Sequence, residues 1–257
     1  MEEILVDRAA NGVVTVTLNR PRVKNSVAAP MWEELRRIFH EVTQTETDRV
    51  LVITGAGGSF CAGADLSGTP LAQTHPLNAM HPVNSAAIAL HDVTKPTIAK
   101  VGGDAVGAGM NLALGCDLVV AGASARFSQI FVRRGLSVDF GGTWLLPRLV
   151  GLHKAKELAL LGDILSAEEA ERIGVVNRVV PDAELDGFVA DWASRLAEGP
   201  PLALQLTKRM LANALSLSLS EALGWEAAAQ TVNLLSDDTT EGVAAFLEKR
   251  APAFRGR

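Results

Sequence analysis

Two glycine-rich turns are the segments whose main chain is best suited to contact a ligand. The first covers residues 53–66 and the second covers residues 102–113. Each turn follows a predicted β-strand, and the second turn opens a predicted helix. Small residues let a ligand approach the backbone closely and leave N–H donors exposed. Together the turns could form an oxyanion hole, whereas either turn alone could simply allow tight packing of a helix on a strand.

A carboxylate that could act as a base lies further along the chain. Asp139 stands in the segment Ser137–Thr143, just before a predicted helix start. An aspartate at such a place often accepts N–H bonds as a helix N-cap. A catalytic base is the second interpretation. Composition alone does not decide between these two roles.

The elements that must position these segments alternate between strands and helices. Hydrophobic periodicity and β-branched runs predict the following elements. Strands are expected at 4–8, 13–18, 49–54, 97–101, 118–120 and 175–180, and helices at 31–42 and 111–115. This order indicates an α/β fold of stacked ββα units around a mostly buried sheet. Residues 67–82 lack periodicity, so they are interpreted either as a mobile loop beside a site or as a surface insertion.

The last third of the chain is predicted to be helical. Ser166 and Glu169 form a capping box, and Gly199–Pro201 marks a boundary between a core, residues 1–198, and a helical region, residues 199–257. Helices are expected at 202–215, 219–235 and 240–249, the last capped by Asp238 with Glu241. Their apolar faces need a partner, either the core or another subunit.

Composition excludes several function classes. The net charge is −5 and the basic residues are scattered, which argues against a nucleic-acid partner. The five histidines and two cysteines lack metal-ligand spacing, so no metal is expected. Cys61 and Cys116 are interpreted as reduced thiols rather than a disulfide. The acidic start of the chain and the lack of a run of about 20 apolar residues predict a soluble, cytoplasmic protein that does not enter a membrane.

Motifs along nearly the whole chain resemble those of one family. They lie at Asn19–Pro21, Phe60–Leu66, Lys95–Pro96, Gly107–Asp117, Gly141–Thr143, Leu160–Gly162, Glu241–Gly242 and Phe246–Arg250. By this combination the chain is identified as a member of the crotonase (enoyl-CoA hydratase/isomerase) superfamily. The resemblance implies a spiral of ββα units, a helical C-terminal trimerisation region, and assembly as a homotrimer or a dimer of trimers. It also implies acyl-CoA substrates, with coenzyme A as part of the substrate and no separate cofactor.

The resemblance also implies roles for individual residues. The oxyanion donors would be the main-chain N–H groups of Ala62 and Ala108. The residues expected at the adenine end of the substrate are Ala64, Asp65 and Leu66. Lys24 and, from a neighbouring subunit, Lys249 would reach the phosphates of coenzyme A, although an exposed lysine is often only solvated.

The chain departs from the hydratases of this family at their two water-activating glutamates. Asn111 and Phe131 stand at these positions, and neither side chain can do acid–base work at neutral pH. Both residues are nevertheless expected to lie in the substrate-binding site. Asn111 would orient Asp139 or a water, or would be an ordinary buried helix residue, while Phe131 would form an apolar pocket wall. The segment around Asp139 is similar to that of phenylacetate-pathway isomerases, whose base is an aspartate at this place. The resemblance therefore favours Asp139 as the base over Asp139 as an N-cap.

These residues predict an isomerase that converts a 3-enoyl-CoA into a 2-enoyl-CoA through an enolate. Asp139 would remove the proton from C2 and return it at C4, and one carboxyl suffices because no water is added. The alternative enzymes are a hydratase or a ring-epoxide isomerase on the same scaffold. From another class, the alternative is a non-catalytic acyl-CoA binder.

Overall fold

A parallel sheet with one antiparallel edge strand forms the centre of the fold. The computed structural model describes residues 2–67 and 75–257. Within them the larger sheet has the order β1-β2-β3-β4-β6-β9, in which only β1 and β2 pair antiparallel. Its strands are β1 (Ile4–Arg8), β2 (Val13–Leu18), β3 (Val50–Gly55), β4 (Thr97–Val101), β6 (Leu118–Gly122) and β9 (Arg178–Val180). The mixed α/β class predicted from the residues is confirmed.

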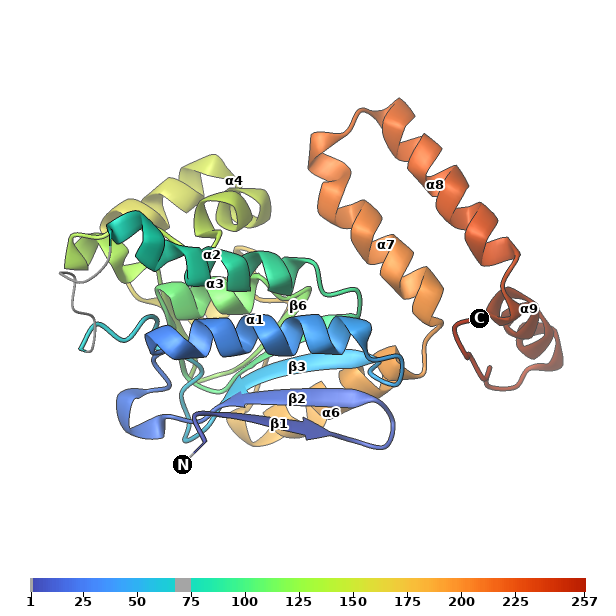
Figure 1. Cartoon of the computed structure of the whole chain (residues 1–257), viewed down its shortest axis with the longest axis horizontal. Coiled ribbons are helices and arrows are strands. Elements are labelled where there is room, and N and C mark those ends of the chain that lie inside the picture. Colours follow the sequence, from blue (N-terminus) through green and yellow to red (C-terminus); the bar gives the residue numbers. More distant parts are fainter. Residues whose placement is uncertain (1, 68–74) are drawn as a thin grey trace.

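Helices cover both faces of this sheet. Alternate residues of the central strands point to opposite faces, so each central strand packs against helices on both sides. Leu51 and Ile53 of β3 pack in the cluster that includes helix α1 (Ala29–Gln44). Val50 and Val52 pack instead with helix α6 (Leu185–Ala197). Figure 1 shows α1, α2 (Pro76–His91) and α3 (Ala108–Leu114) on one side of the sheet and α6 on the other. A strand buried on both faces explains the uninterrupted apolar run of β3.

A smaller sheet lies beside the second glycine-rich turn. It has the order β5-β7-β8, formed by β5 (Asp104–Val106), β7 (Arg126–Ser128) and β8 (Leu165–Ser166). The bend predicted over residues 102–109 therefore contains a short strand. Helix α4 (Gly142–Leu161) and helix α5 (Ala167–Arg172) follow. Ser166 accepts the Glu169 N–H at 3.2 Å, but the Glu169 carboxylate binds Arg172, so only half of the predicted capping box forms.

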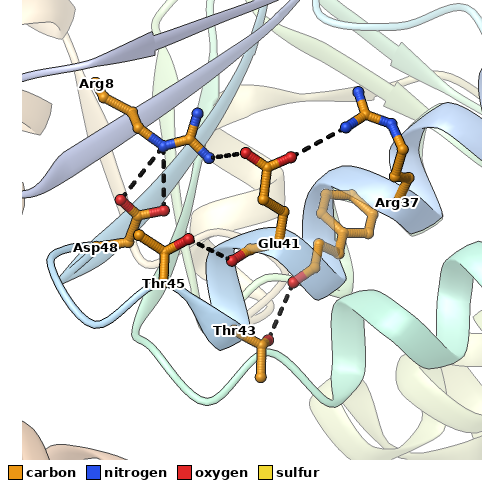
Figure 2. Close-up of polar contacts among 7 residues, drawn as sticks. Arg8, Arg37, Glu41, Thr43, Thr45 and Asp48 are labelled. Carbon is orange, nitrogen blue, oxygen red and sulfur yellow. Dashed lines mark hydrogen bonds and ion pairs between the residues drawn. The ribbon is translucent and has the colours of Figure 1, made fainter.

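Ion pairs tie the edge strand β1 to the end of α1. Arg8 binds Glu41 at 2.8 Å and the buried Asp48 at 3.3 Å, and Glu41 also pairs with Arg37 (Figure 2). Thr45 donates its hydroxyl to the Glu41 carbonyl at the end of the same helix (Figure 2). These contacts close one end of the sheet, at the amino ends of β2 and β3.

The last three helices project away from the body that holds the sheet (Figure 1). They are α7 (Pro201–Asn213), α8 (Leu219–Leu234) and α9 (Asp237–Glu248). The boundary predicted at residue 199 falls in the short connection between α6 and α7, and the division into two domains stays a prediction. The N-cap of α9 is Ser236, which accepts the Thr239 N–H at 3.3 Å. The predicted cap, Asp238, accepts instead from the Arg255 and Gly256 N–H groups, so that prediction was wrong.

The sequence misplaced two further elements. Residues 76–82 were predicted as loop but begin helix α2, where the His75 ring accepts the Leu77 N–H at 3.3 Å. Polar residues and Pro82 inside the helix interrupt the apolar periodicity by which a helix is predicted. Residues 68–74 of the predicted loop lie outside the described residues. The strand expected at 175–180 is shorter, because Val175 and Val176 bond back to the Ala170 carbonyl.

Candidate active site

A pocket of about 330 Å³ lies beyond the carboxyl ends of β3 and β4. Ligands of open parallel sheets commonly bind at this edge. Four segments line it: Lys24 after β2, the turn after β3, the segment from β5 into α3, and the residues that precede α4. The lining residues are Lys24, Ala62, Gly63, Ala64, Leu66, Asp104, Val106, Gly107, Ala108, Ile130, Phe131, Arg134, Leu136 and Asp139. The two glycine-rich turns and Asp139 therefore meet around one cavity.

The two turns are in direct backbone contact. The Val106 N–H donates to the Cys61 carbonyl at 2.9 Å, and a Cβ at Gly109 would stand 2.2 Å from the same oxygen. A Cβ at Gly63 would stand 2.9 Å from the Val106 carbonyl oxygen and 3.5 Å from the Ala108 nitrogen. Only glycine allows such close approach, which brings the first turn against the start of α3.

One of the two predicted oxyanion donors, the Ala108 N–H, has no acceptor among the residues that the structure describes. Ala108 is the first residue of α3, so its N–H has no acceptor within the helix. The Ala62 N–H donates to the Lys24 carbonyl at 2.9 Å, and it is not available to a substrate. The prediction of Ala62 as a donor was therefore wrong.

Ala64 supplies the second N–H. Val27 donates to the Gly63 carbonyl at 2.8 Å and accepts from the Asp65 N–H at 2.9 Å, so the bonds of this parallel bridge flank Ala64. The Ala64 N–H therefore points away from Val27, and it has no acceptor among the described residues. Ala64 lines the pocket beside Ala108. This pair of N–H groups can bind an oxyanion.

Asp139 carries the carboxyl that faces this pocket. Its Oδ1 atom is buried and has no hydrogen-bond partner in the part of the chain that the structure describes. Burial raises the pKa of the carboxyl to about 6. The N-cap of α4 is Gly141, so Asp139 does not cap that helix. A carboxyl with a free buried oxygen and a raised pKa is suited to accept a proton near neutral pH.

The backbone that carries Asp139 adopts an uncommon conformation. Phe140 has a φ of +47° and Gly141 a φ of +75°, both in the left-handed region. Left-handed backbone is unusual for a bulky residue and is kept only where packing enforces it. Here the Phe140 side chain is buried, with its ring centroid 5.3 Å from that of Trp32.

The pocket also contains charged residues, two of which form an ion pair. Lys24 pairs with Asp104 at 2.8 Å, and Arg126 pairs with the same carboxylate at 2.8 Å. Arg134 also lines the pocket, a role that no motif in the sequence indicated. Among the described carboxylates of this pocket, Asp139 and Asp104, only Asp139 lacks a cationic partner.

The remaining predicted residues are divided between the pocket and other places. Phe131 and Leu66 line the cavity, but Asp65 does not, since its carboxylate binds Arg20 at 2.8 Å and Ser67. These bonds to Ser67 and Arg20 lower the pKa of Asp65 to about 2. Asn111 is fully buried behind the pocket wall, so its assignment as a substrate-binding residue was wrong. Lys249 ends α9, away from the cavity of its own chain.

Comparison with known proteins agrees with this geometry. The model of the family described as enoyl-CoA hydratase/isomerase matches residues 8–257. The chain belongs to this family. It is 40% identical to the 1,2-epoxyphenylacetyl-CoA isomerase of Escherichia coli K12 and 38% identical to the 2,3-dehydroadipyl-CoA hydratase of the same strain, each over the whole of both chains. The crystal structure of the enoyl-CoA hydratase from Bacillus anthracis superposes with a TM-score of 0.95 at 35% identity, covering both chains fully.

Membership makes the chain an enzyme of a family that acts on acyl-CoA thioesters. The crotonase-type fold with its helical C-terminal region is likewise confirmed. Among the described residues, no helix is long and apolar enough to cross a membrane. The same residues contain no cluster of three or more side chains that could hold a metal ion.

The raised pKa of Asp139 predicts a pH-dependent cost to stability. The carboxyl is neutral below about pH 4 in both states, because an unfolded aspartate has a pKa of about 3.9. Between that value and about 6 the unfolded chain ionises first, so folding becomes less favourable as pH rises. We expect Asp139→Asn to raise the melting temperature by roughly 2–6 °C at pH 8 and to have no effect at pH 4. Thermal unfolding at both pH values measures this, and a variant less stable than the wild type at pH 8 contradicts it.

Proposed function

We propose that this enzyme isomerises a 3-enoyl-CoA to a 2-enoyl-CoA with Asp139 as its single base. The observation that carries the proposal is the arrangement around one pocket of a carboxyl and two N–H groups that have no partner within residues 2–67 and 75–257. The Ala64 and Ala108 N–H groups bind the thioester oxygen, where negative charge develops. Asp139 lies beside them, where the α-carbon of the bound thioester is expected.

The reaction proceeds by two proton transfers. Asp139 takes a proton from C2, the C–H electron pair moves into the new C1–C2 double bond, and negative charge collects on the thioester oxygen. The dienolate then takes the proton back from Asp139 at C4, which moves the double bond from C3–C4 to C2–C3. Atoms and charges balance without water or a redox partner. The buried, apolar surroundings of Asp139 keep its proton strongly held between the two steps.

Hydration fits the site less well than isomerisation. Addition of water to a 2-enoyl-CoA needs groups that activate the water and protonate C2. Asn111 is buried away from the pocket, and Phe131 presents only an apolar ring to it. Asp104, the other carboxylate in the pocket, is held by Lys24 and Arg126.

Isomerisation of a ring-epoxide acyl-CoA is the second candidate. The relative of 40% identity over the whole chain is named for that reaction. The same base and oxyanion donors would serve a substrate whose acidic C–H lies next to the thioester carbonyl. An aromatic acyl group would suit the apolar wall formed by Ile130, Phe131 and Leu136.

A substrate panel separates these functions. Purified enzyme is incubated with crotonyl-CoA, a 3-enoyl-CoA and ring-epoxidised phenylacetyl-CoA, and the products are identified by liquid chromatography and mass spectrometry. We expect the 3-enoyl-CoA to be converted at least about tenfold faster than crotonyl-CoA. Faster hydration of crotonyl-CoA, or binding of every ester without turnover, contradicts the proposal.

We also propose that the chain assembles as a trimer or a dimer of trimers through α7–α9. Apolar side chains exposed on these helices and their connections include Leu211, Leu215, Leu219, Leu223, Trp225, Val232, Leu235, Val243, Phe246 and Leu247. An apolar surface of this extent is typical of an interface. Light scattering is expected to give three or six times the mass of one chain, and a monomer would contradict the assembly. In the assembly, Lys249 would reach the pocket of a neighbouring subunit.

A further inference from the structure

A pair of buried amides lies directly behind the segment that carries Asp139. Asn111 Nδ2 donates to the Asp139 carbonyl at 2.8 Å, and Gln129 Nε2 donates to Asn111 Oδ1 at 2.7 Å. Both amide side chains are at most 1% exposed. Gln129 Oε1 is also buried, and no described residue donates to it. A buried polar pair of this kind is costly unless its members are hydrogen-bonded, and buried hydrogen bonds also hold their partners in place.

The amide pair joins the two halves of the reacting centre. Asn111 lies one helical turn after Ala108 on α3, so its amide connects the helix of one oxyanion donor with the segment of the base. A Cβ at Gly142 would stand 2.3 Å from Asn111 Nδ2, so the contact is closely packed as well as hydrogen-bonded. The Gly142 N–H donates to the same Asp139 carbonyl at 2.9 Å. The left-handed backbone at Phe140 is thus held from two sides.

We propose that Asn111 and Gln129 are positioning residues, whose buried amides fix the Asp139 carboxyl relative to the Ala108 N–H. This inference rests on the proposed function, because it assumes that Asp139 is the base. An amide suits this place better than a carboxylate, since only an amide donates to the Asp139 carbonyl while accepting from Gln129. A carboxylate would also add negative charge beside the base.

Kinetics of Asn111→Ala test the role of the amide. A displacement of about 1 Å at a reacting group can cost ~10² in rate. We expect kcat for the 3-enoyl-CoA to fall about 10- to 100-fold, with KM within about threefold. The charged side chains that share the pocket with Asp139 are Lys24, Asp104 and Arg134, and none of them is altered. The midpoint of the pH–rate profile is expected to fall, because a loosened carboxyl gains access to water.

Two further variants keep the test decisive. Gln129→Met removes the donor to Asn111 with little change in side-chain length, and a smaller loss of kcat of the same pattern is expected. Thr97→Val is the matched control, because it breaks the hydrogen bonds between the buried Thr97 hydroxyl and Asp117 at the amino end of β4, away from the site. We expect this control to lower thermal stability without moving kcat or the pH midpoint.

The outcomes separate this inference from the proposed function. If Asp139→Ala retains activity, the proposed function fails. If Asp139→Ala is inactive while Asn111→Ala and Gln129→Met keep kcat within threefold and leave the pH midpoint unchanged, only the positioning role fails. Equal losses of kcat in Thr97→Val would likewise overturn it, because they would reflect general destabilisation. Asn111→Ala should add no further loss to Asp139→Ala.

Discussion

Replacing Asp139 with alanine is expected to lower kcat for conversion of a 3-enoyl-CoA by about 10³ or more, within the ~10²–10⁴ that a positioned acid–base group contributes. The loss is large because no other base is available: Asp104, the other carboxylate of the described pocket, is neutralised by Lys24 and Arg126 and cannot replace Asp139. The alanine variant is expected to bind the CoA ester with a Kd within about threefold of the wild type. Stopped-flow absorbance and calorimetric titration measure the two quantities.

The pH dependence of the wild type provides an internal check on the same assignment. A base must be ionised in the free enzyme, and burial raises the pKa of Asp139 to about 6. We therefore expect kcat/KM to rise with pH, to reach half its maximum near pH 6 and then to level off. Asp139→Asn keeps the shape of the side chain and should be as inactive as the alanine variant. Activity of either variant within a few-fold of the wild type contradicts the role of Asp139.

Replacing Ala108 with proline is expected to lower kcat by about 10²–10³, the usual loss for one oxyanion donor. Proline removes the N–H and fits the first position of a helix, where no intrahelical bond is lost. The preceding Gly107 has a φ of +58° and a ψ of −128°, a conformation that glycine adopts without strain. The substitution is therefore expected to remove the N–H donor while α3 stays folded.

Ala108→Gly is the matched control for this variant, because it shortens the side chain and keeps the N–H. We expect the glycine variant to retain kcat within a few-fold. Far-ultraviolet circular dichroism and thermal unfolding of both variants show whether α3 is preserved. A folded proline variant with nearly full kcat would mean that the Ala108 N–H does not bind the developing negative charge.

Elements with strong local signals were predicted well from the residues. The β-branched strand Val13–Leu18 and the apolar run that ends at Gly55 were located to within a residue or two. Helix α2 was missed between residues 76 and 82, because its start depends on a cap by His75 and its interior contains Pro82. The sequence likewise placed the cap of α9 at Asp238, whose carboxylate binds the distant Arg255 and Gly256 N–H groups. Bonds between residues remote in sequence override such local patterns.

The candidate site was predicted in its composition but not in its details. Asp139, Ala108 and Phe131 line the pocket as the motifs indicated. The choice between the Ala62 and Ala64 N–H groups depends on which of them bonds the segment Lys24–Val27, a pairing across nearly forty residues that leaves no local signal. The link from Gln129 through Asn111 to Asp139 is equally long-range. Sequence patterns identify the chemical groups, whereas tertiary hydrogen bonds decide which groups stay free.

The fate of the C2 hydrogen tests most directly whether one carboxyl carries the proton from C2 to C4. Wild-type enzyme is given a 3-enoyl-CoA that carries deuterium at both C2 positions, and the product is analysed by mass spectrometry and nuclear magnetic resonance at early conversion. Since Oδ1 of Asp139 is buried, exchange of the transferred deuteron with water should be slow. We expect 2-enoyl-CoA with deuterium at C4. Product whose added C4 hydrogen comes entirely from water, or recovery of the substrate unchanged, would contradict the single-base mechanism.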